Sequence, residues 1–392
     1  MAFVSGAQAG TTEPPVNLIH VGIVPPSWHS REQGIGSKRP KDGREQNVKQ
    51  RLTTLLNQLS MGHNLTREQA RWTFDRIMAG ELEPIVIGAL LGAMIAKGES
   101  VDELVGAAEA MRAAGIRISC DGDCIDTCGT GGDGISTFNV STTAGIIAAS
   151  AGAIVAKHGN RSTTRASGST EVLHQLGVDV DAPTDVVERC LREVRIGYLN
   201  ARQLHPAMKF AVPVRRAIPA RTIFNLLGPL TNPAGARRQI LGVPHMNLLD
   251  KMADTLLALN ATHAWVVHGC DGLCDLTITG PTTVVEIRHG TRNRFSVTPG
   301  DVGLSCAPLD SLIVDSPAAS AQAVMGILQG QSGPRRDHAL LNAGAALVVA
   351  GIVGDIGEGV DRAGGAVDDG SALATLERWR AMAPILQTDA EV

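Results

Sequence analysis

The spacing of apolar residues between positions 48 and 114 predicts a run of helices with no strand among them. The first helical face is formed by Leu52, Leu55, Leu56 and Leu59. Two capping boxes, Thr66 with Gln69 and Ser100 with Glu103, predict two further helix starts, and Gly115 predicts the end of the last helix. Four helices without strands indicate a small helical domain.

The pattern changes after residue 121, where short β-rich runs alternate with helical segments. The predicted strands are 124–128, 153–156, 239–243, 264–267, 276–279 and 284–288. This alternation indicates an α/β domain with a mostly parallel central sheet. Ligands of such sheets bind at the carboxyl ends of the strands, so segments that directly follow strands are candidate sites.

Residues 184–217 interrupt the alternation with two further helical patterns. We expect them to rejoin the helical domain and to form a cleft with the segment after residue 157. The predicted organisation is a flexible extension over 1–46, a small helical domain of 47–115 and about 184–217, and a large α/β domain of 116–183 and about 218–385, before a tail over 386–392. The extension has no basic start before an apolar core, so it does not resemble a secretory signal.

Composition narrows the class of protein. The chain has 392 residues, of which 44% are hydrophobic and 19% charged, as in a globular protein with a sizeable core. A formal net charge of -4 and 3% aromatic residues argue against nucleic-acid binding. The apolar runs at 145–156 and 343–353 are too short to cross a bilayer. Seven cysteines, an odd number without the common Cys-x2-Cys metal spacing, indicate free thiols in a reducing compartment, and we expect a cytoplasmic protein.

A glycine-rich stretch, Gly-Thr-Gly-Gly-Asp-Gly at 129–134, follows the first predicted strand. A polar segment, Asn-Val-Ser-Thr at 139–142, then opens a helix of small residues. Glycines allow a backbone to approach a ligand closely, and a helix N-terminus favours anions, so together they indicate a phosphate site. Alone, the loop is equally compatible with a tight turn, because it lacks the P-loop lysine and the dinucleotide glycine spacing.

A basic segment, Lys-His-Gly-Asn-Arg at 157–161, follows the second predicted strand, and a hydroxyl-rich segment follows it at 162–169. By itself the basic segment could be a solvated turn. Beside a glycine loop it indicates a polyphosphate site, and the hydroxyls could bind a second phosphate. A sugar with phosphates at both ends would fit two such patches. Asp133 could then bind sugar hydroxyls, and magnesium would be expected between phosphates.

Five motifs in a fixed order carry a resemblance to a known family. They are 129–134, 139–142, 157–161, His-Pro-Ala-Met-Lys at 205–209, and Arg-Thr-Ile-Phe-Asn-Leu-Leu-Gly-Pro-Leu-Thr-Asn-Pro-Ala at 221–234. From about residue 48 to about 379 the chain resembles anthranilate phosphoribosyltransferase. The resemblance implies a homodimer that transfers phosphoribose from phosphoribosyl pyrophosphate to the amine of anthranilate in tryptophan biosynthesis, using Mg²⁺.

The resemblance also implies roles for single residues, and none of them is a general acid or base. Phosphoribosyl pyrophosphate would be bound by Gly129, Gly132, Asp133, Asn139, Ser141, Thr142, Lys157 and Ser169. Anthranilate would be bound by Gly129, His158, Asn160 and Arg215. Metal would be bound by Ser141 and by the pair Cys274 and Asp275.

Three departures from the family pattern leave alternatives open. Cys274 and Asp275 replace an Asp-Glu pair, and a thiol is a poor ligand for Mg²⁺, although Asp271 could help from nearby. Ala166 replaces a lysine, and Ala-Ile-Pro at 217–219 replaces Glu-Leu-Gly. The enzyme either works with a weaker second metal, or uses another acceptor, or has reduced activity. A pyrimidine nucleoside phosphorylase-like enzyme and a nucleic-acid-binding relative are the rival functions.

Overall fold

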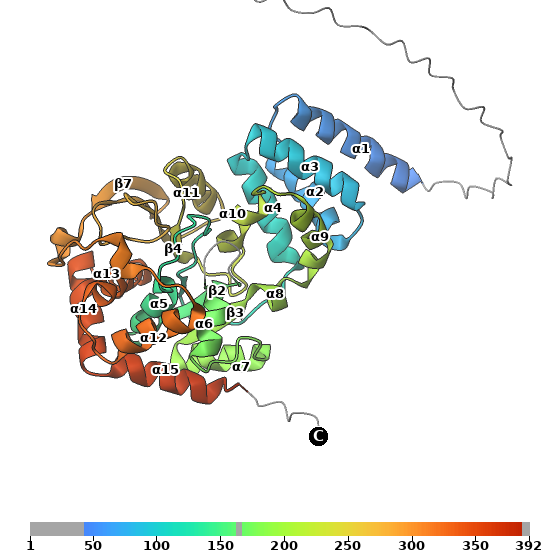
Figure 1. Cartoon of the computed structure of the whole chain (residues 1–392). Helices are drawn as coiled ribbons and strands as arrows, with labels where there is room; N and C mark the ends of the chain where they lie inside the picture. The colour runs from blue at the N-terminus through green and yellow to red at the C-terminus, as the bar shows by residue number, and fades with distance from the viewer. Residues whose placement is uncertain (1–42, 162–166, 386–392) are drawn as a thin grey trace, which may run out of the picture. The chain divides into compact units, whose positions relative to one another are not determined.

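The computed structural model describes residues 43–161 and 167–385 (Figure 1). The chain divides into two units, 1–48 and 49–392, and only the first residues of helix α1 are described in the first unit. The expectations of a flexible extension before residue 43 and of a tail over 386–392 therefore lie outside the described residues. Within the described ranges, no helix has both the length and the apolar character needed to cross a membrane.

The predicted helical region consists of four helices. They are α1 (Gly43–Ser60), α2 (Arg67–Ala79), α3 (Pro84–Lys97) and α4 (Val101–Ala114). Both predicted capping boxes form, since Thr66 accepts from the Gln69 backbone and Ser100 accepts from the Glu103 backbone. Gly115 directly follows α4 as predicted. The sequence signals thus located these helix ends correctly.

A seven-stranded sheet forms the centre of the second region, in the order β3-β2-β1-β4-β5-β6-β7. The strands are β1 (Cys124–Asp126), β2 (Ile154–Gly159), β3 (Ile196–Asn200), β4 (Arg238–Gly242), β5 (His263–Gly269), β6 (Thr282–Arg288) and β7 (Thr291–Val297). The first five strands in this order, from β3 through β2, β1 and β4 to β5, pair in parallel, and β6 and β7 add an antiparallel edge. The predicted fold class, α/β with a mostly parallel sheet beside a helical domain, is confirmed.

The predicted strand at 276–279 is wrong. Its backbone is paired with side chains instead of a neighbouring strand: Leu276 N donates to Asn342 Oδ1 at 3.0 Å, and Asn342 Nδ2 donates to Leu276 O at 2.8 Å. Asp271 accepts from the hydroxyls of Thr277 and Thr279, which bends the segment into a loop. Strands β3 and β7 were not predicted, and β7 is a largely exposed polar edge strand without an apolar run.

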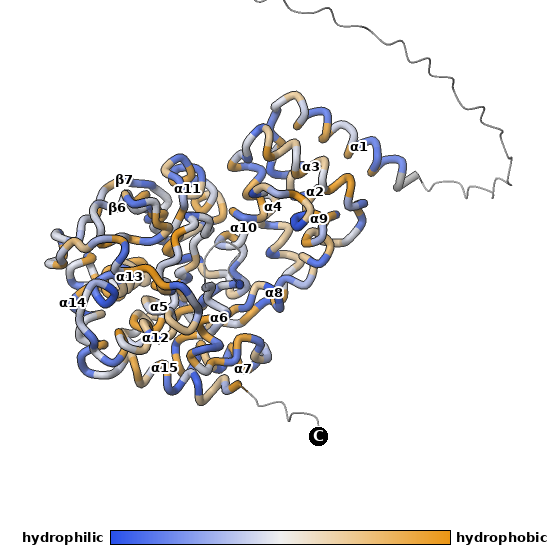
Figure 2. Tube along the Cα trace, in the orientation of Figure 1, coloured by the Kyte–Doolittle hydropathy of each residue, from blue (hydrophilic) through white to orange (hydrophobic). Residues whose placement is uncertain are grey.

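Helices pack on both faces of the sheet. Longer ones are α5 (Val140–Ser150), α11 (Leu248–Ala258), α12 (Pro317–Leu328), α13 (Pro334–Ala350), α14 (Ile356–Asp368) and α15 (Ser371–Met382). Shorter ones are α6 (Ser169–Gln175), α7 (Thr184–Arg189), η1 (Cys190–Val194), α8 (Ala201–Leu204), η2 (Pro206–Phe210), α9 (Val212–Ala217), α10 (Phe224–Leu227), η3 (Gly228–Leu230), η4 (Pro299–Val302) and η5 (Leu309–Leu312). Apolar residues fill the second half of α13 (Figure 2), which packs against α5. Helices α2 to α4 share a second core with α11.

The expectation that 184–217 as a whole joins the helical domain needs correction. Residues 184–204 pack into the core of the sheet domain, and β3 within them pairs with β2 along five residues. Residues 206–217 contact the helical region, where η2 packs on α2 and α9 packs on α3. The physical reason is burial: every residue of β3 is buried, so its backbone needs a strand partner.

Candidate active site

Three segments meet at the carboxyl end of the sheet. The glycine loop over 129–134 follows β1, and Gly242 ends the neighbouring strand β4. The backbone N of Thr130 donates to the carbonyl oxygen of Gly242 at 2.9 Å. A Cβ atom at Gly242 would lie 1.6 Å from the carbonyl oxygen of Cys274, so only glycine allows the Cys274 segment to approach. The loop is therefore packed between strand ends, where an α/β sheet binds its ligand.

The glycine loop itself adopts left-handed backbone geometry at two adjacent positions. Gly131 has a φ of 60° and Gly132 a φ of 93°. Its acidic residue, Asp133, accepts from the backbone N of Ile135 at 3.3 Å and from that of Cys274 at 3.1 Å. The loop is thus a turn that the hydrogen bonds of Asp133 stabilise and whose backbone conformation requires glycine.

Lys157 lies inside β2, not after the strand as predicted, and only 1% of its surface is exposed. Its Nζ donates to Ser141 Oγ at 3.2 Å and to Thr127 Oγ1 at 3.4 Å. Burial lowers the pKa of Lys157, and the carboxylates of Asp126 and Asp275 oppose that shift. The amino group of Lys157 is therefore held at the strand ends beside two hydroxyl groups, where an anionic ligand would stabilise its charged form.

The N-terminus of α5 lies next to this ammonium group. Asn139 caps the helix through Oδ1, which accepts from Thr142 N at 3.1 Å and from Ser141 Oγ at 3.2 Å. Its Nδ2 donates to Ser169 Oγ at 3.3 Å and so links α5 to the start of α6. The structure thus brings together most of the residues expected to bind phosphoribosyl pyrophosphate, at an end of α5 that favours anions.

The residues expected to bind metal line one small pocket. The pocket is lined by Thr127, Gly129, Ser141, Ala144, Ile240, Gly242, Cys274, Asp275 and Asn342. It offers the carboxylate of Asp275 and the hydroxyl of Ser141, which are the hard oxygen ligands that Mg²⁺ prefers. Because Mg²⁺ keeps several waters and binds substrate phosphates, one carboxylate suffices for a partial site. The thiol of Cys274 does not fit this ion.

Asp271, which was expected to help from nearby, is not among the residues that line this pocket. Its Oδ2 accepts from Thr277 Oγ1 at 2.6 Å and from Thr279 Oγ1 at 2.9 Å, and its Oδ1 accepts from the backbone N of Leu273 at 3.1 Å. These bonds occupy both carboxylate oxygens in folding the loop that carries Cys274 and Asp275. Asp271 therefore supports the loop and does not face the pocket as a ligand.

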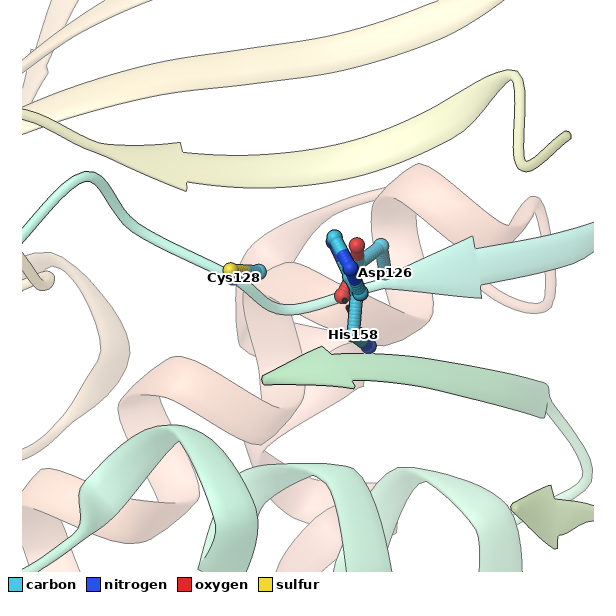
Figure 3. Close-up of side chains that lie close together, drawn as sticks. All are labelled: Asp126, Cys128 and His158. Carbon is cyan, nitrogen blue, oxygen red and sulfur yellow. Dashed lines mark hydrogen bonds between the residues drawn. The ribbon is translucent and has the colours of Figure 1, made fainter. Parts of the chain in front are cut away.

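A second group of possible ligands lies close together: Asp126, Cys128 and His158, with donor atoms within 4.8 Å of one another (Figure 3). Burial raises the pKa of Asp126 to about 6, although the Asn232 amide opposes the shift. Both oxygens of Asp126 are already bonded, to the backbone N of His158 at 3.2 Å and to Asn232 Nδ2 at 2.7 Å. Burial also raises the pKa of Cys128 to about 12. We read this group as a hydrogen-bonding support beneath the site, because a thiol and an imidazole do not suit Mg²⁺.

Two buried histidines stand edge to face beside the strand ends. The ring centroids of His158 and His205 are 5.2 Å apart. Burial is the main cause that lowers the pKa of His158 to about 3 and that of His205 to about 4. His158 Nδ1 lies 3.0 Å from the carbonyl oxygen of Gly228, which assigns the proton to Nδ1. The Nε2 atoms of both rings are buried without a hydrogen-bond partner among the described residues. Because the proton of His158 is on Nδ1, its Nε2 keeps a lone pair for a ligand.

Arg215 and Asn160 are not linked to the glycine loop by any hydrogen bond among the described residues. Arg215 is half-buried, burial lowers its pKa, and its guanidinium lies 5.3 Å from the ring centroid of Phe224. Its neighbour Arg216 is exposed, so only Arg215 is directed into the protein. Asn160 is exposed, and its Oδ1 accepts from the backbone N of Arg161 at 2.8 Å. Ala166, which replaces a lysine of the family pattern, lies outside the described residues.

Sequence reasoning missed two contributors to the site. Gly242 was counted only as part of a strand, although a glycine at the carboxyl end of a parallel strand is a signal for close approach of another segment. Asp126 falls within the predicted strand 124–128, but it is fully buried and accepts from the backbone of β2 at His158.

Comparisons with known proteins define first the class and then the family. Two family models match the chain: a glycosyl transferase family helical bundle domain over residues 53–115, and a glycosyl transferase family a/b domain over residues 121–373. The anthranilate phosphoribosyltransferase of Roseiflexus castenholzii is 50% identical over 82% of this chain and 95% of its own length. The anthranilate phosphoribosyltransferase of Anaeromyxobacter sp. is 49% identical over 81% of this chain and 94% of its own length. The chain belongs to the anthranilate phosphoribosyltransferase family, as its five motifs predicted.

Solved structures agree with this assignment. Anthranilate phosphoribosyltransferase from Thermus thermophilus matches with a TM-score of 0.80 and 39% identity, covering 84% of this chain and 98% of its own. The Saccharomyces cerevisiae enzyme in complex with PRPP and Mg has the same fold, with a TM-score of 0.78 and 24% identity over 85% and 97% of the two chains.

Proposed function

We propose that this protein is a magnesium-dependent anthranilate phosphoribosyltransferase of tryptophan biosynthesis. It joins the amine nitrogen of anthranilate to C1 of the ribose while the C1–oxygen bond to pyrophosphate breaks, and the amine loses a proton. The observation that carries this proposal is the contact of Lys157 with Ser141 at the strand ends, in a pocket that Asp275 also lines. Family membership supports the same reaction and favours it over phosphorolysis of a nucleoside.

The donor, phosphoribosyl pyrophosphate, binds along the glycine loop and the start of α5. Lys157 supplies an amino group whose charged form the bound anion stabilises, and the N-terminus of α5 presents the positive end of the helix dipole. Further donor-binding residues are Gly129, Gly132, Asp133, Asn139, Ser141, Thr142 and Ser169. Asp133 is already bonded to the Cys274 backbone, so the donor and the Cys274 segment are coupled through one carboxylate.

Magnesium would be held by Asp275 and Ser141, with water and phosphate oxygens completing its shell. When bound it neutralises the negative charge that develops on the leaving pyrophosphate. The chain's own contribution there is positional, because Lys157 and the α5 terminus hold the phosphates in line with the acceptor. Cys274 contributes backbone contacts to the site but no metal bond.

The acceptor, anthranilate, binds on the side of His158 and Arg215, together with Gly129 and Asn160. Arg215 is suited to pair with the carboxylate through two parallel hydrogen bonds. His158 has a lone pair on Nε2 and a strongly lowered pKa, so it accepts a hydrogen bond from the amine without carrying charge. No strong base is needed, because an aryl amine already carries its lone pair at neutral pH.

We also propose a cytoplasmic homodimer, with residues 47–115 and 205–217 as the helical domain. The resemblance and the free cysteines support these assignments. Light scattering after size-exclusion chromatography tests the dimer, and a mass of one chain, 41.0 kDa, would refute it.

Loss of anthranilate fluorescence tests the function. With phosphoribosyl pyrophosphate and Mg²⁺ we expect the fluorescence to fall, and EDTA to stop the reaction. Thymidine with phosphate should give no thymine. Steady fluorescence at saturating Mg²⁺ would contradict the proposed acceptor, and thymine release would identify a phosphorylase instead.

A further inference from the structure

Arg221 reaches the glycine loop from a different part of the chain. It lies between α9, which packs on the helical region, and α10. Its Nη1 and Nη2 donate to the carbonyl oxygen of Gly131 at 3.1 and 3.2 Å. One guanidinium thus binds the backbone at the tip of the loop with both of its terminal nitrogens.

The guanidinium also fills the space over the next residue of the loop. A Cβ atom at Gly132 would lie 1.2 Å from Arg221 Nη1. The space that a side chain at Gly132 would need therefore holds a positive charge. Because Arg221 is exposed, that charge can move over the loop without unpacking a core.

The charge of Arg221 has no acidic partner among the described residues. Two other arginines of the domain have carboxylate partners: Arg238 with Asp123 at 3.2 Å, and Arg336 with Asp368 at 2.8 Å. Arg237, like Arg221, donates to a carbonyl oxygen and has no acidic partner among the described residues. Among the described residues, Arg221 donates to a neutral carbonyl oxygen, that of Gly131, on which two of its N–H groups converge. A phosphate offers charged oxygens that match the same two donors, so it would compete effectively with that carbonyl.

We propose that Arg221 is a pyrophosphate-binding residue of the donor site, a role that rests on the proposed function. Without phosphoribosyl pyrophosphate, Arg221 is hydrogen-bonded to the carbonyl oxygen of Gly131. When phosphoribosyl pyrophosphate binds, the N–H groups of Arg221 leave that carbonyl and donate to the diphosphate. Lys157 then binds the anion from the strand side and Arg221 binds it from the outer side of the loop. The loop carries no lysine, so Arg221 supplies the charge that a P-loop would carry itself.

If Arg221 only stabilised the loop, a neutral side chain that donates to Gly131 could replace it without loss of pyrophosphate binding. Arg221→Gln keeps a hydrogen-bond donor and removes the charge, and Arg221→Lys keeps the charge and loses the planar fork. Arg237→Gln is the matched control, since Arg237 is also exposed and donates to a backbone carbonyl, that of Asn260, at 2.8 Å.

Calorimetric titration of the full chain with inorganic pyrophosphate and Mg²⁺ measures this role without any turnover. We expect Arg221→Gln to weaken binding about tenfold or more and Arg221→Lys to weaken it less, with Arg237→Gln binding like the unmodified protein. In turnover, KM for phosphoribosyl pyrophosphate should rise by a similar factor, while KM for anthranilate stays within about twofold.

Equal pyrophosphate binding by Arg221→Gln and the unmodified protein would overturn the inference, as would a loss that comes with a lower Tm and an equal rise of both KM values. If the unmodified protein binds pyrophosphate more tightly than Arg221→Gln but does not consume anthranilate, the proposed acceptor fails and the role of Arg221 stands.

Discussion

The ammonium Nζ of Lys157 lies 3.2 Å from the hydroxyl oxygen of Ser141, which joins the carboxyl end of β2 to the first turn of α5. Of the side chains in the structure, Lys157 is among the largest that are fully buried. Burying an ammonium group is costly unless it binds an anion, so its presence indicates a function more than a gain in stability.

We expect Lys157→Met to separate these two effects. Removing the buried charge should leave Tm unchanged or raise it, because the cost of desolvation disappears. At the same time kcat/KM for phosphoribosyl pyrophosphate should fall at least about tenfold, the scale of a lost hydrogen bond to a charged group. Thermal unfolding and steady-state kinetics check the pair of outcomes. A large fall in Tm with normal kcat/KM would mean that Lys157 is structural.

Three buried groups at the site contribute to the response of stability to pH. His158 and His205, with pKa values lowered to about 3 and about 4, stay neutral in the fold when the unfolded chain already binds protons below about pH 6.5. Stability should therefore be lost as pH falls. Asp126, with its pKa raised to about 6, opposes this, because the folded protein binds its proton first.

Between about pH 4 and 6 the unfolded chain binds a proton at each of the two imidazoles, whereas the folded protein binds one proton at Asp126. These three groups together should therefore lower the free energy of unfolding by about 1.4 kcal/mol for each unit by which the pH falls. Urea unfolding at several pH values measures that slope. In His158→Gln the slope should decrease by about 1.4 kcal/mol per pH unit, because the contribution of that ring is removed. Gln at the exposed His245 is the matched control. An unchanged slope in His158→Gln would show that this ring is not kept neutral by the fold.

The metal side of the pocket yields a gain-of-function prediction. The double substitution Cys274→Asp with Asp275→Glu supplies two carboxylates in place of a thiol and one acid. We expect it to lower the Mg²⁺ concentration needed for half-maximal activity several-fold, as measured by Mg²⁺ titration of the fluorescence assay. Cys306→Asp, at an exposed thiol outside the pocket, should have no effect. If the double variant behaves like the unmodified protein, the altered pair does not limit metal binding.

The acceptor side is tested by two adjacent arginines. Arg215 is half-buried over Phe224, whereas Arg216 is exposed. Arg215→Gln should raise KM for anthranilate about tenfold or more and leave KM for phosphoribosyl pyrophosphate nearly unchanged, since it removes a paired charge from the acceptor alone. Arg216→Gln should behave like the unmodified protein. Equal effects of the two substitutions would refute the assignment of Arg215.

Helix ends and parallel strands with apolar runs were predictable, because caps and burial leave strong local patterns. Thr66, Ser100 and Gly115 are examples. The loop at 276–279 was not predictable, because its apolar pattern suits a strand and only Asn342, far away in the chain, binds its backbone. In the same way β7 depends on pairing with β6 and shows no apolar run of its own.

The candidate site was predictable where one motif follows one strand. Its glycine loop is of this kind, and Lys157 was located to the second strand, although it lies inside that strand and not after it. What depended on three-dimensional contact was missed, such as the approach of Cys274 to Gly242 and that of Arg221 to Gly131. Neither pair leaves a local signal, since their members are at least 30 residues apart in the chain.

The central claim is the transfer of phosphoribose to anthranilate in the Lys157 pocket. Its most direct test is to follow anthranilate consumption and pyrophosphate release in one reaction with Mg²⁺, and to weigh the product by mass spectrometry. We predict one pyrophosphate for each anthranilate consumed, a product with the mass of N-(5-phosphoribosyl)anthranilate, and loss of both signals in Lys157→Met. Pyrophosphate release without anthranilate consumption, or equal rates in Lys157→Met, would contradict the account.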